Sequence, residues 1–125
     1  MKKLIAGFVV LALVIVLVVA CGGSGGGGST DVHMGNTNFT QPSITISKGN
    51  SLNLVNDAAV THIISNGMWV NGAPNPMAEP GAPTVSNMQF TSAGQSQTIG
   101  PFNTAGTYHL YCSVHQGMNL TVTVQ

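Results

Sequence analysis

The sequence predicts an all-β protein, folded as a β-sandwich of seven or eight short strands. Apolar and polar residues alternate over short runs, which is the period of a strand with one buried face. No long window repeats its apolar residues at helical spacing, and glycine, proline or asparagine separates one run from the next. The part after the N-terminal segment, about 95 residues, is long enough for one modest core.

The alternating runs give the order of the expected strands, which cover residues 31–34, 44–46, 52–56, 60–64, 89–91, 97–99, 107–112 and 120–124. Lys48-Gly49-Asn50 predicts a hairpin turn between the second and third of these runs. Four prolines lie between residues 66 and 87. Because proline removes ladder donors and fixes φ, we expect a long loop there with at most one short strand.

The N-terminal segment differs in composition from the rest of the chain. Met1-Lys2-Lys3 is followed by an apolar stretch that ends in Val18-Val19-Ala20-Cys21, which predicts a signal helix. The arrangement resembles the bacterial lipoprotein signal, which implies cleavage before Cys21 and lipid attachment to it. An uncleaved transmembrane anchor is the alternative. Either arrangement attaches the protein to the cell membrane outside the cytoplasm, in the periplasm or on the outer face.

Composition also sets the domain boundaries. We expect a signal peptide over 1–20, then the lipidation cysteine and a flexible linker over 21–29, because 22–29 contains only glycine and serine. Residues 30–125 form the folded domain. This domain carries one positive charge against three negative ones, net −2 with neutral histidines, on Lys48, Asp31, Asp57 and Glu79. It therefore has no basic patch for nucleic acid and little charge to steer a partner.

A thiol, an imidazole and a thioether follow one another as Cys112, His115 and Met118, in the pattern Cys-x-x-His-x-x-Met. This set suits copper that cycles between Cu(I) and Cu(II). A second imidazole is available from His62, fifty residues before Cys112. We therefore predict a mononuclear blue-copper centre that carries single electrons. Each residue also has a structural interpretation that needs no metal. A buried cysteine packs as a small hydrophobe, a core histidine hydrogen-bonds to the backbone, and a methionine fills space in the core.

The same residues resemble the cupredoxin family, which includes plastocyanin, amicyanin, azurin and auracyanin. The resemblance runs from Phe39 to the C-terminus and is carried by Phe39-x-x-Pro42-x-Ile44-x-Ile46-x-x-Gly49-x-x-Leu52-x-Leu54-x-Asn56, by His62, and by Phe102-x-x-x-Gly106-Thr107-Tyr108-x-x-Tyr111-Cys112-x-x-His115-x-x-Met118. It implies a Greek-key sandwich with one type 1 copper ion near one end. It also implies His62, Cys112 and His115 as equatorial ligands and Met118 as the axial ligand.

The resemblance has one departure near the first histidine. Thr61 and Ile63 stand where the family often has proline and asparagine. That asparagine commonly ties the two ligand loops together, so we expect a different link between the loops here. As partners the resemblance implies redox proteins, such as a cytochrome or a membrane electron-transfer complex, for a protein that acts as a monomer.

Three further side chains, two aromatic rings and one imidazole, have both a structural and a functional interpretation. Trp69 is a core plug or loop anchor, or else part of an apolar rim where a redox partner docks. Tyr111, next to a candidate ligand, is a second electron path or else an exposed strand aromatic. His109 lies on the strand face opposite Cys112, so we expect a surface or inter-strand role rather than ligation.

Other functions are less well supported by the residues. A copper-binding or delivery protein is the main alternative, because the chain has six methionines and delivery sites use exchangeable sulfur ligands. A copper enzyme would need further centres with paired His-x-His motifs, and the sequence has none. A metal-free adhesion lipoprotein would leave the candidate ligands unexplained.

Overall fold

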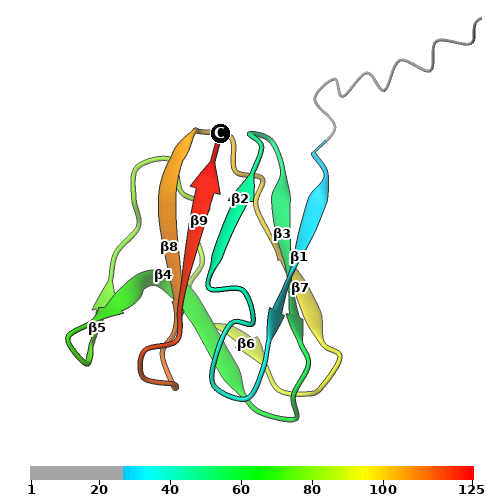
Figure 1. Ribbon diagram of the computed structural model, residues 1–125, viewed down its shortest axis with the longest axis vertical. Coiled ribbons are helices and arrows are strands. Elements are labelled where there is room, and N and C mark those ends of the chain that lie inside the picture. Colours follow the sequence, from blue (N-terminus) through cyan, green and yellow to red (C-terminus); the bar gives the residue numbers. More distant parts are fainter. Residues whose placement is uncertain (1–26) are drawn as a thin grey trace, which may run out of the picture.

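The computed structural model describes residues 27–125 and shows two β-sheets packed face to face (Figure 1). The predictions of a signal helix, of a lipidated Cys21 and of most of the linker fall on residues outside this range. Within residues 27–125, no helix has the length and hydrophobicity needed to span a bilayer.

The sandwich has nine strands in the described part of the chain: β1 (Ser29–Met34), β2 (Ser43–Ile46), β3 (Ser51–Asn56), β4 (His62–Val70), β5 (Ala73–Pro76), β6 (Met88–Phe90), β7 (Ser96–Ile99), β8 (Gly106–Cys112) and β9 (Asn119–Val124). One sheet has the order β1-β3-β7. The other has the order β2-β9-β8-β4-β5, with β6 paired to β4. The predicted fold class is confirmed, and each expected strand is present.

The core lies between the sheets and follows from the alternation along each strand. In β3 and β9 every second residue is buried, so Leu52 and Leu54 face Leu120 and Val122 across the sandwich. Phe90 and Phe102 are among the largest fully buried side chains. Burial of one such side chain contributes about 1.5–3 kcal/mol, which makes this shared core the main source of stability.

The prediction of a hairpin at residues 48–50 is wrong. β2 pairs in parallel with β9, whereas β3 pairs with β1 and β7 in the other sheet. The turn therefore passes from one sheet to the other. It is held by hydrogen bonds from Lys48 N–H to the Gln125 carbonyl at 3.0 Å and from Gly49 N–H to the Phe102 carbonyl at 2.7 Å. Turn residues signal a reversal of direction, but they do not specify whether the next strand stays in the same sheet.

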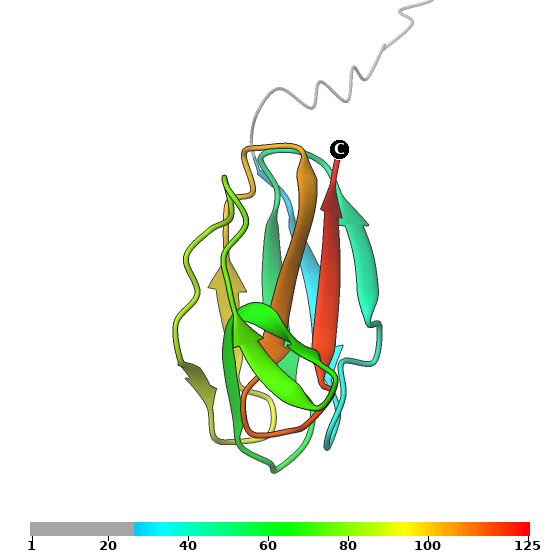
Figure 2. The ribbon, with the colours of Figure 1, turned by 90° about the vertical axis from the view of Figure 1, so that its left-hand side faces the viewer.

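The expected long loop over 66–87 is partly regular structure. β4 continues to Val70, turns at Asn71-Gly72 and returns as β5, and we name this hairpin the β4–β5 wing (Figure 2). Asn71 and Gly72 have φ values of 50° and 79°, as a two-residue hairpin turn requires. The prolines in β5 are tolerated because β5 is an edge strand with exposed residues.

The rest of that segment is fastened to the sandwich by two polar side chains. The Asn66 side chain is buried, accepts from Val85 N–H at 2.6 Å and donates to the Pro83 carbonyl at 3.0 Å. Glu79 pairs with the His109 ring at 2.5 Å, on the outer face of β8. The segment also contributes Val85 to the core, so it is held to the sandwich by both hydrogen bonds and packing.

Candidate metal centre

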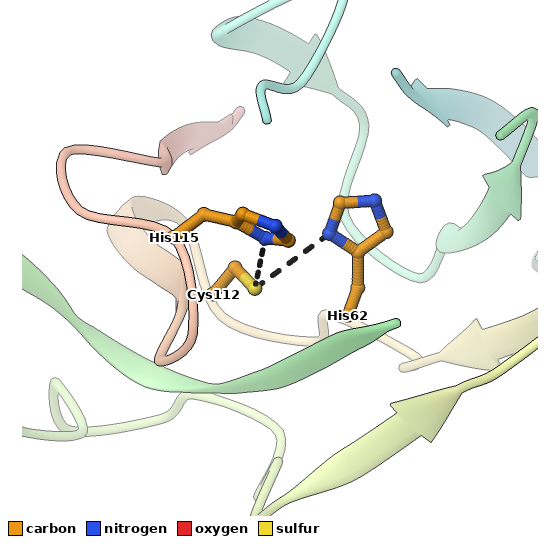
Figure 3. A group of neighbouring side chains, drawn as sticks. All are labelled: His62, Cys112 and His115. Atoms are coloured by element: carbon orange, nitrogen blue, oxygen red, sulfur yellow. Dashed lines mark hydrogen bonds between the residues drawn. The ribbon is translucent and has the colours of Figure 1, made fainter. Parts of the chain in front are cut away.

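Three potential metal ligands from distant parts of the chain meet at one end of the sandwich. His62 opens β4, Cys112 closes β8, and His115 lies in the turn between β8 and β9. Their ligand atoms all lie within 4.8 Å of one another. The Cys112 Sγ lies 3.6 Å from His62 Nδ1 and 3.4 Å from His115 Nδ1, so both rings turn their Nδ1 toward the sulfur (Figure 3).

His62 is fully buried and is held in one tautomer by the backbone. Its Nε2 lies 2.8 Å from the Gly35 carbonyl oxygen. A carbonyl can only accept, so Nε2 carries the proton and Nδ1 keeps its lone pair toward Cys112. Burial lowers the pKa of His62 below its ordinary value, the Gly35 carbonyl opposes this, and nearby His115 lowers it further. The ring is therefore neutral at pH 7 and ready to ligate.

The loop that leads into His62 is organised by Asn56. This side chain is fully buried and donates to the carbonyls of Val60 at 3.0 Å and Ser92 at 3.2 Å. Its oxygen accepts from Ala58 N–H at 3.3 Å. With these bonds Asn56 fixes the short loop between β3 and β4 and so sets the starting point of β4.

The turn that carries the other candidate ligands is closed by backbone hydrogen bonds. Cys112 N–H donates to the Met118 carbonyl at 3.0 Å, and Met118 N–H donates to the His115 carbonyl at 3.2 Å. Met118 has a buried side chain, whereas the preceding Gln116 and Gly117 are exposed. The turn therefore brings Met118 back beside Cys112 and His115.

The two ligand-bearing segments are joined through the backbone. Ser113 N–H donates to the Ile63 carbonyl at 2.9 Å, and the Ser113 hydroxyl lies 3.4 Å from the same oxygen. This contact links the residue after Cys112 to the residue after His62. The two segments are thus joined without an amide side chain at position 63.

The residues present fit a copper ion. The donor set is one thiol and two imidazole nitrogens with their lone pairs converging, and a buried thioether follows in the same turn. Burial of His62 and Cys112 keeps water from the site, and the carbonyl bond orients one ligand ring as outer partners of metal sites do.

Comparison with known proteins agrees with this chemistry. Residues 27–125 match the family of copper-binding proteins described as the plastocyanin/azurin family. The chain belongs to this family. It is a cupredoxin, its cofactor is one type 1 copper ion, and it is not an enzyme.

Individual relatives support the same assignment. A plastocyanin from Scenedesmus fuscus is 32% identical over 90 residues, covering 70% of this chain and 86% of the relative. Amicyanin from Paracoccus versutus shares the fold with a TM-score of 0.58 at 21% identity, over 78% of this chain and 81% of that one. A purple cupredoxin from Nitrosopumilus maritimus has a TM-score of 0.58 at 21% identity, over 77% of this chain and 99% of that one.

Of the remaining predicted residues of this cupredoxin, two lie beside the centre and one does not. Trp69 is half-buried in the β4–β5 wing, where its indole N–H donates to the Cys112 carbonyl at 2.9 Å. Tyr111 is only 4% exposed, so the reading of an exposed strand aromatic is wrong. The wing covers it, with the Trp69 ring edge-on to the Tyr111 ring at 6.3 Å. His109 points away from the centre and bonds to Glu79.

Two polar residues near the centre were missed by the sequence analysis as contributors to the site. From the sequence, Asn56 is only one residue of the family pattern, and nothing marks out Asn119. Asn119 accepts from Trp69 N–H at 2.7 Å through its side-chain oxygen. Asparagine is common in turns and loops. Its presence in the sequence therefore does not distinguish a side chain that hydrogen-bonds two segments together from an exposed turn residue.

Proposed function

We propose that this protein is a blue-copper electron carrier in which His62, Cys112 and His115 would hold the metal, with the thioether of Met118 as a weaker fourth ligand. Copper would supply the one-electron Cu(I)/Cu(II) couple. The chain contributes a thiol, two imidazoles and a thioether with little freedom to rearrange, which suits a centre that must serve both oxidation states.

The observation that carries this proposal is the convergence of two Nδ1 atoms on one buried sulfur. A cysteine that served only as a core hydrophobe would not need two imidazoles turned toward it. A histidine that served only the core would not need its free nitrogen to face a thiol. The half-buried His115 beside the buried His62 gives the centre one side that approaches solvent, which is where an electron would enter and leave.

The decisive experiment is a visible spectrum of the copper-loaded protein. We expect an intense thiolate-to-copper charge-transfer band that is bleached by reductant and absent from Cys112→Ser. The matched control is Cys21→Ser, which removes the other cysteine of the chain and should leave the band unchanged. A band that survives in Cys112→Ser, or that never forms with added copper, would contradict the proposal.

We further propose that the protein works outside the cytoplasm, tethered through a lipid on Cys21 and passing electrons between redox proteins. The support is the charged start, the apolar stretch and the small residues before Cys21, followed by a glycine and serine linker. Mass spectrometry of the membrane fraction tests this. Cleavage before Cys21 with added lipid mass is expected, whereas an intact Met1 would show that the segment is retained.

Copper exchange separates electron transfer from copper delivery. His62 and Cys112 are fully buried, so we expect slow loss of copper to a weak chelator, over a time much longer than one electron transfer. Rapid loss, with transfer to an acceptor protein, would favour delivery instead.

A further inference from the structure

Trp69 is bonded to both ends of the turn that carries the candidate ligands. Its indole N–H donates to the Cys112 carbonyl at 2.9 Å. Its backbone N–H donates to Asn119 Oδ1 at 2.7 Å, and Asn119 Nδ2 donates back to the Trp69 carbonyl at 3.3 Å. Cys112 is the last residue of β8 and Asn119 the first of β9, so one residue of the β4–β5 wing spans the whole turn.

The Cys112 carbonyl is free for this bond because of how the turn closes. The register between β8 and β9 pairs Tyr111 with Asn119, so the next pair is Cys112 with Met118. In an antiparallel ladder such a pair exchanges two hydrogen bonds. Cys112 N–H does donate to the Met118 carbonyl, at 3.0 Å, but Met118 N–H turns to the His115 carbonyl at 3.2 Å. The Cys112 carbonyl thus lacks its ladder donor, and the Trp69 indole supplies one.

A packing role alone does not account for this arrangement. The Trp69 ring covers Tyr111 at 6.3 Å with an interplanar angle of 87°, and a phenyl ring could provide similar cover. The indole N–H is different. Phenylalanine has no donor and the donor of tyrosine is a hydroxyl outside its ring, whereas the donor of tryptophan is part of its large ring system. The wing is also close to the turn at a second place, where a Cβ on Gly72 would lie 2.8 Å from Gln116 Nε2.

We propose that Trp69 is a positioning residue for the metal thiolate. Its indole N–H fixes the peptide of Cys112, and its backbone fixes Asn119, the neighbour of Met118. The distance between the thiolate and the thioether ends of the turn is then set by a rigid β-hairpin rather than by the turn alone. This inference rests on the proposed ligand set.

The test compares two variants of the full chain that each remove one hydrogen bond from an aromatic side chain to a backbone carbonyl. Trp69→Phe removes the bond to Cys112 and keeps an aromatic ring. Tyr108→Phe, the control, removes the bond from the Tyr108 hydroxyl to the Thr104 carbonyl at 2.7 Å, toward the other end of β8. Both should lose similar stability, measured by denaturant unfolding of the metal-free protein.

The two variants should differ at the centre. We expect Trp69→Phe to bind copper about 10- to 100-fold more weakly, the usual effect of losing a partner that orients a ligand, and to change the charge-transfer and electron paramagnetic resonance spectra. In the metal-free protein, alkylation of the Cys112 thiol should become about five- to tenfold faster, as expected when one hydrogen bond that holds the turn is lost. Tyr108→Phe should leave all three quantities unchanged.

Several outcomes would overturn the inference. Unchanged affinity, spectra and alkylation in Trp69→Phe would assign Trp69 to packing, and equal changes in both variants would indicate a general loss of stability. If Trp69→Phe does not fold, Asn119→Ala decides, since it removes only the bonds to the Trp69 backbone and should move the same quantities in the same direction. Failure of the unmodified protein to show a thiolate-to-copper band would instead reject the proposed function, and the alkylation rates would still report on the turn.

Discussion

The Nε2–H of His62 donates to the Gly35 carbonyl across 2.8 Å, which leaves the Nδ1 of a fully buried ring facing Cys112. His115 has the same Nδ1 orientation but is only half-buried, in the turn after β8. The two imidazoles therefore have the same chemistry toward the thiol and unequal access to solvent.

This difference predicts which imidazole can be replaced from outside. In His115→Gly the removed ring leaves a gap that opens to solvent, so added imidazole should restore most of the charge-transfer band of the copper-loaded protein. In His62→Gly the gap is sealed, and imidazole should restore little. Titration of both variants with imidazole, followed by absorption, measures this. Equal recovery in both would mean that the buried position of His62 does not limit access.

Gly67 allows β5 to approach β4, and we expect Gly67→Ala to be strongly destabilising. A Cβ there would lie 2.4 Å from the Asn75 carbonyl oxygen, and the φ of Gly67 is +129°. Backbone strain and overpacking together predict a loss of about 2–4 kcal/mol in the free energy of unfolding. Gly94→Ala is the control, because its φ is +84° but a Cβ would have nothing within 4 Å, so only about 1–2 kcal/mol should be lost. Similar losses in both would argue against the close contact in the wing.

Asn66 should control the order of the segment that follows the wing. Asn66→Ala leaves Val85 N–H and the Pro83 carbonyl without the partners they have at 2.6 and 3.0 Å, which should cost about 1–3 kcal/mol. Amide hydrogen exchange at Val85 should accelerate more than exchange in β9. Asn75→Ala, which removes an exposed amide, should change neither stability nor exchange at Val85. Retained protection of Val85 in Asn66→Ala would show that other contacts hold this segment.

The surface pair of His33 and Asp57 should respond to pH. The hydrogen bond that the His33 ring donates to Asp57 raises the pKa of His33 above its ordinary value, loss of hydration opposes this, and the charges of Asp57 and Asp31 raise it further. Protonated His33 therefore stabilises the folded state. This contribution is fully present when the pH is below the pKa of histidine in the unfolded chain, and it is lost as the pH rises through the pKa of His33 in the folded protein. NMR titration of His33 should show a clear fall of its pKa in Asp57→Asn and a smaller fall in Asp31→Asn. An unchanged pKa in Asp57→Asn would contradict the pair.

Electron exchange between two copies of the protein should depend weakly on salt. The residues that the structure describes carry few charges, and Val114 beside His115 is 50% exposed and apolar. We expect the self-exchange rate to change by less than about threefold between about 0.01 and 1 M salt. In Val114→Glu, repulsion between like charges should slow exchange at low salt, and added salt should restore it. A steep dependence in the unmodified protein would show that charge, rather than apolar contact, governs the encounter.

Much of the fold and the candidate site could be predicted because the signals are local. Alternation along residues 120–124 places Leu120, Val122 and Val124 on one face wherever the strand is used. The ligand spacing in the turn after Cys112 needs no tertiary information either. His62 was the harder case, since its position in the sequence does not place it near Cys112, and the resemblance to cupredoxins supplied that link.

By itself, then, the sequence determined the strand faces, the identity of the candidate metal ligands and the low charge of the domain, because these depend on side-chain type and on a period of two. Only the tertiary structure decided that the turn at 48–50 crosses between sheets, that the β4–β5 wing covers Tyr111, and that Trp69 holds the carbonyl of Cys112. These features depend on which strand ends meet and on which backbone groups lack a ladder partner. That choice is made by packing across the whole sandwich, and no short stretch of sequence encodes it.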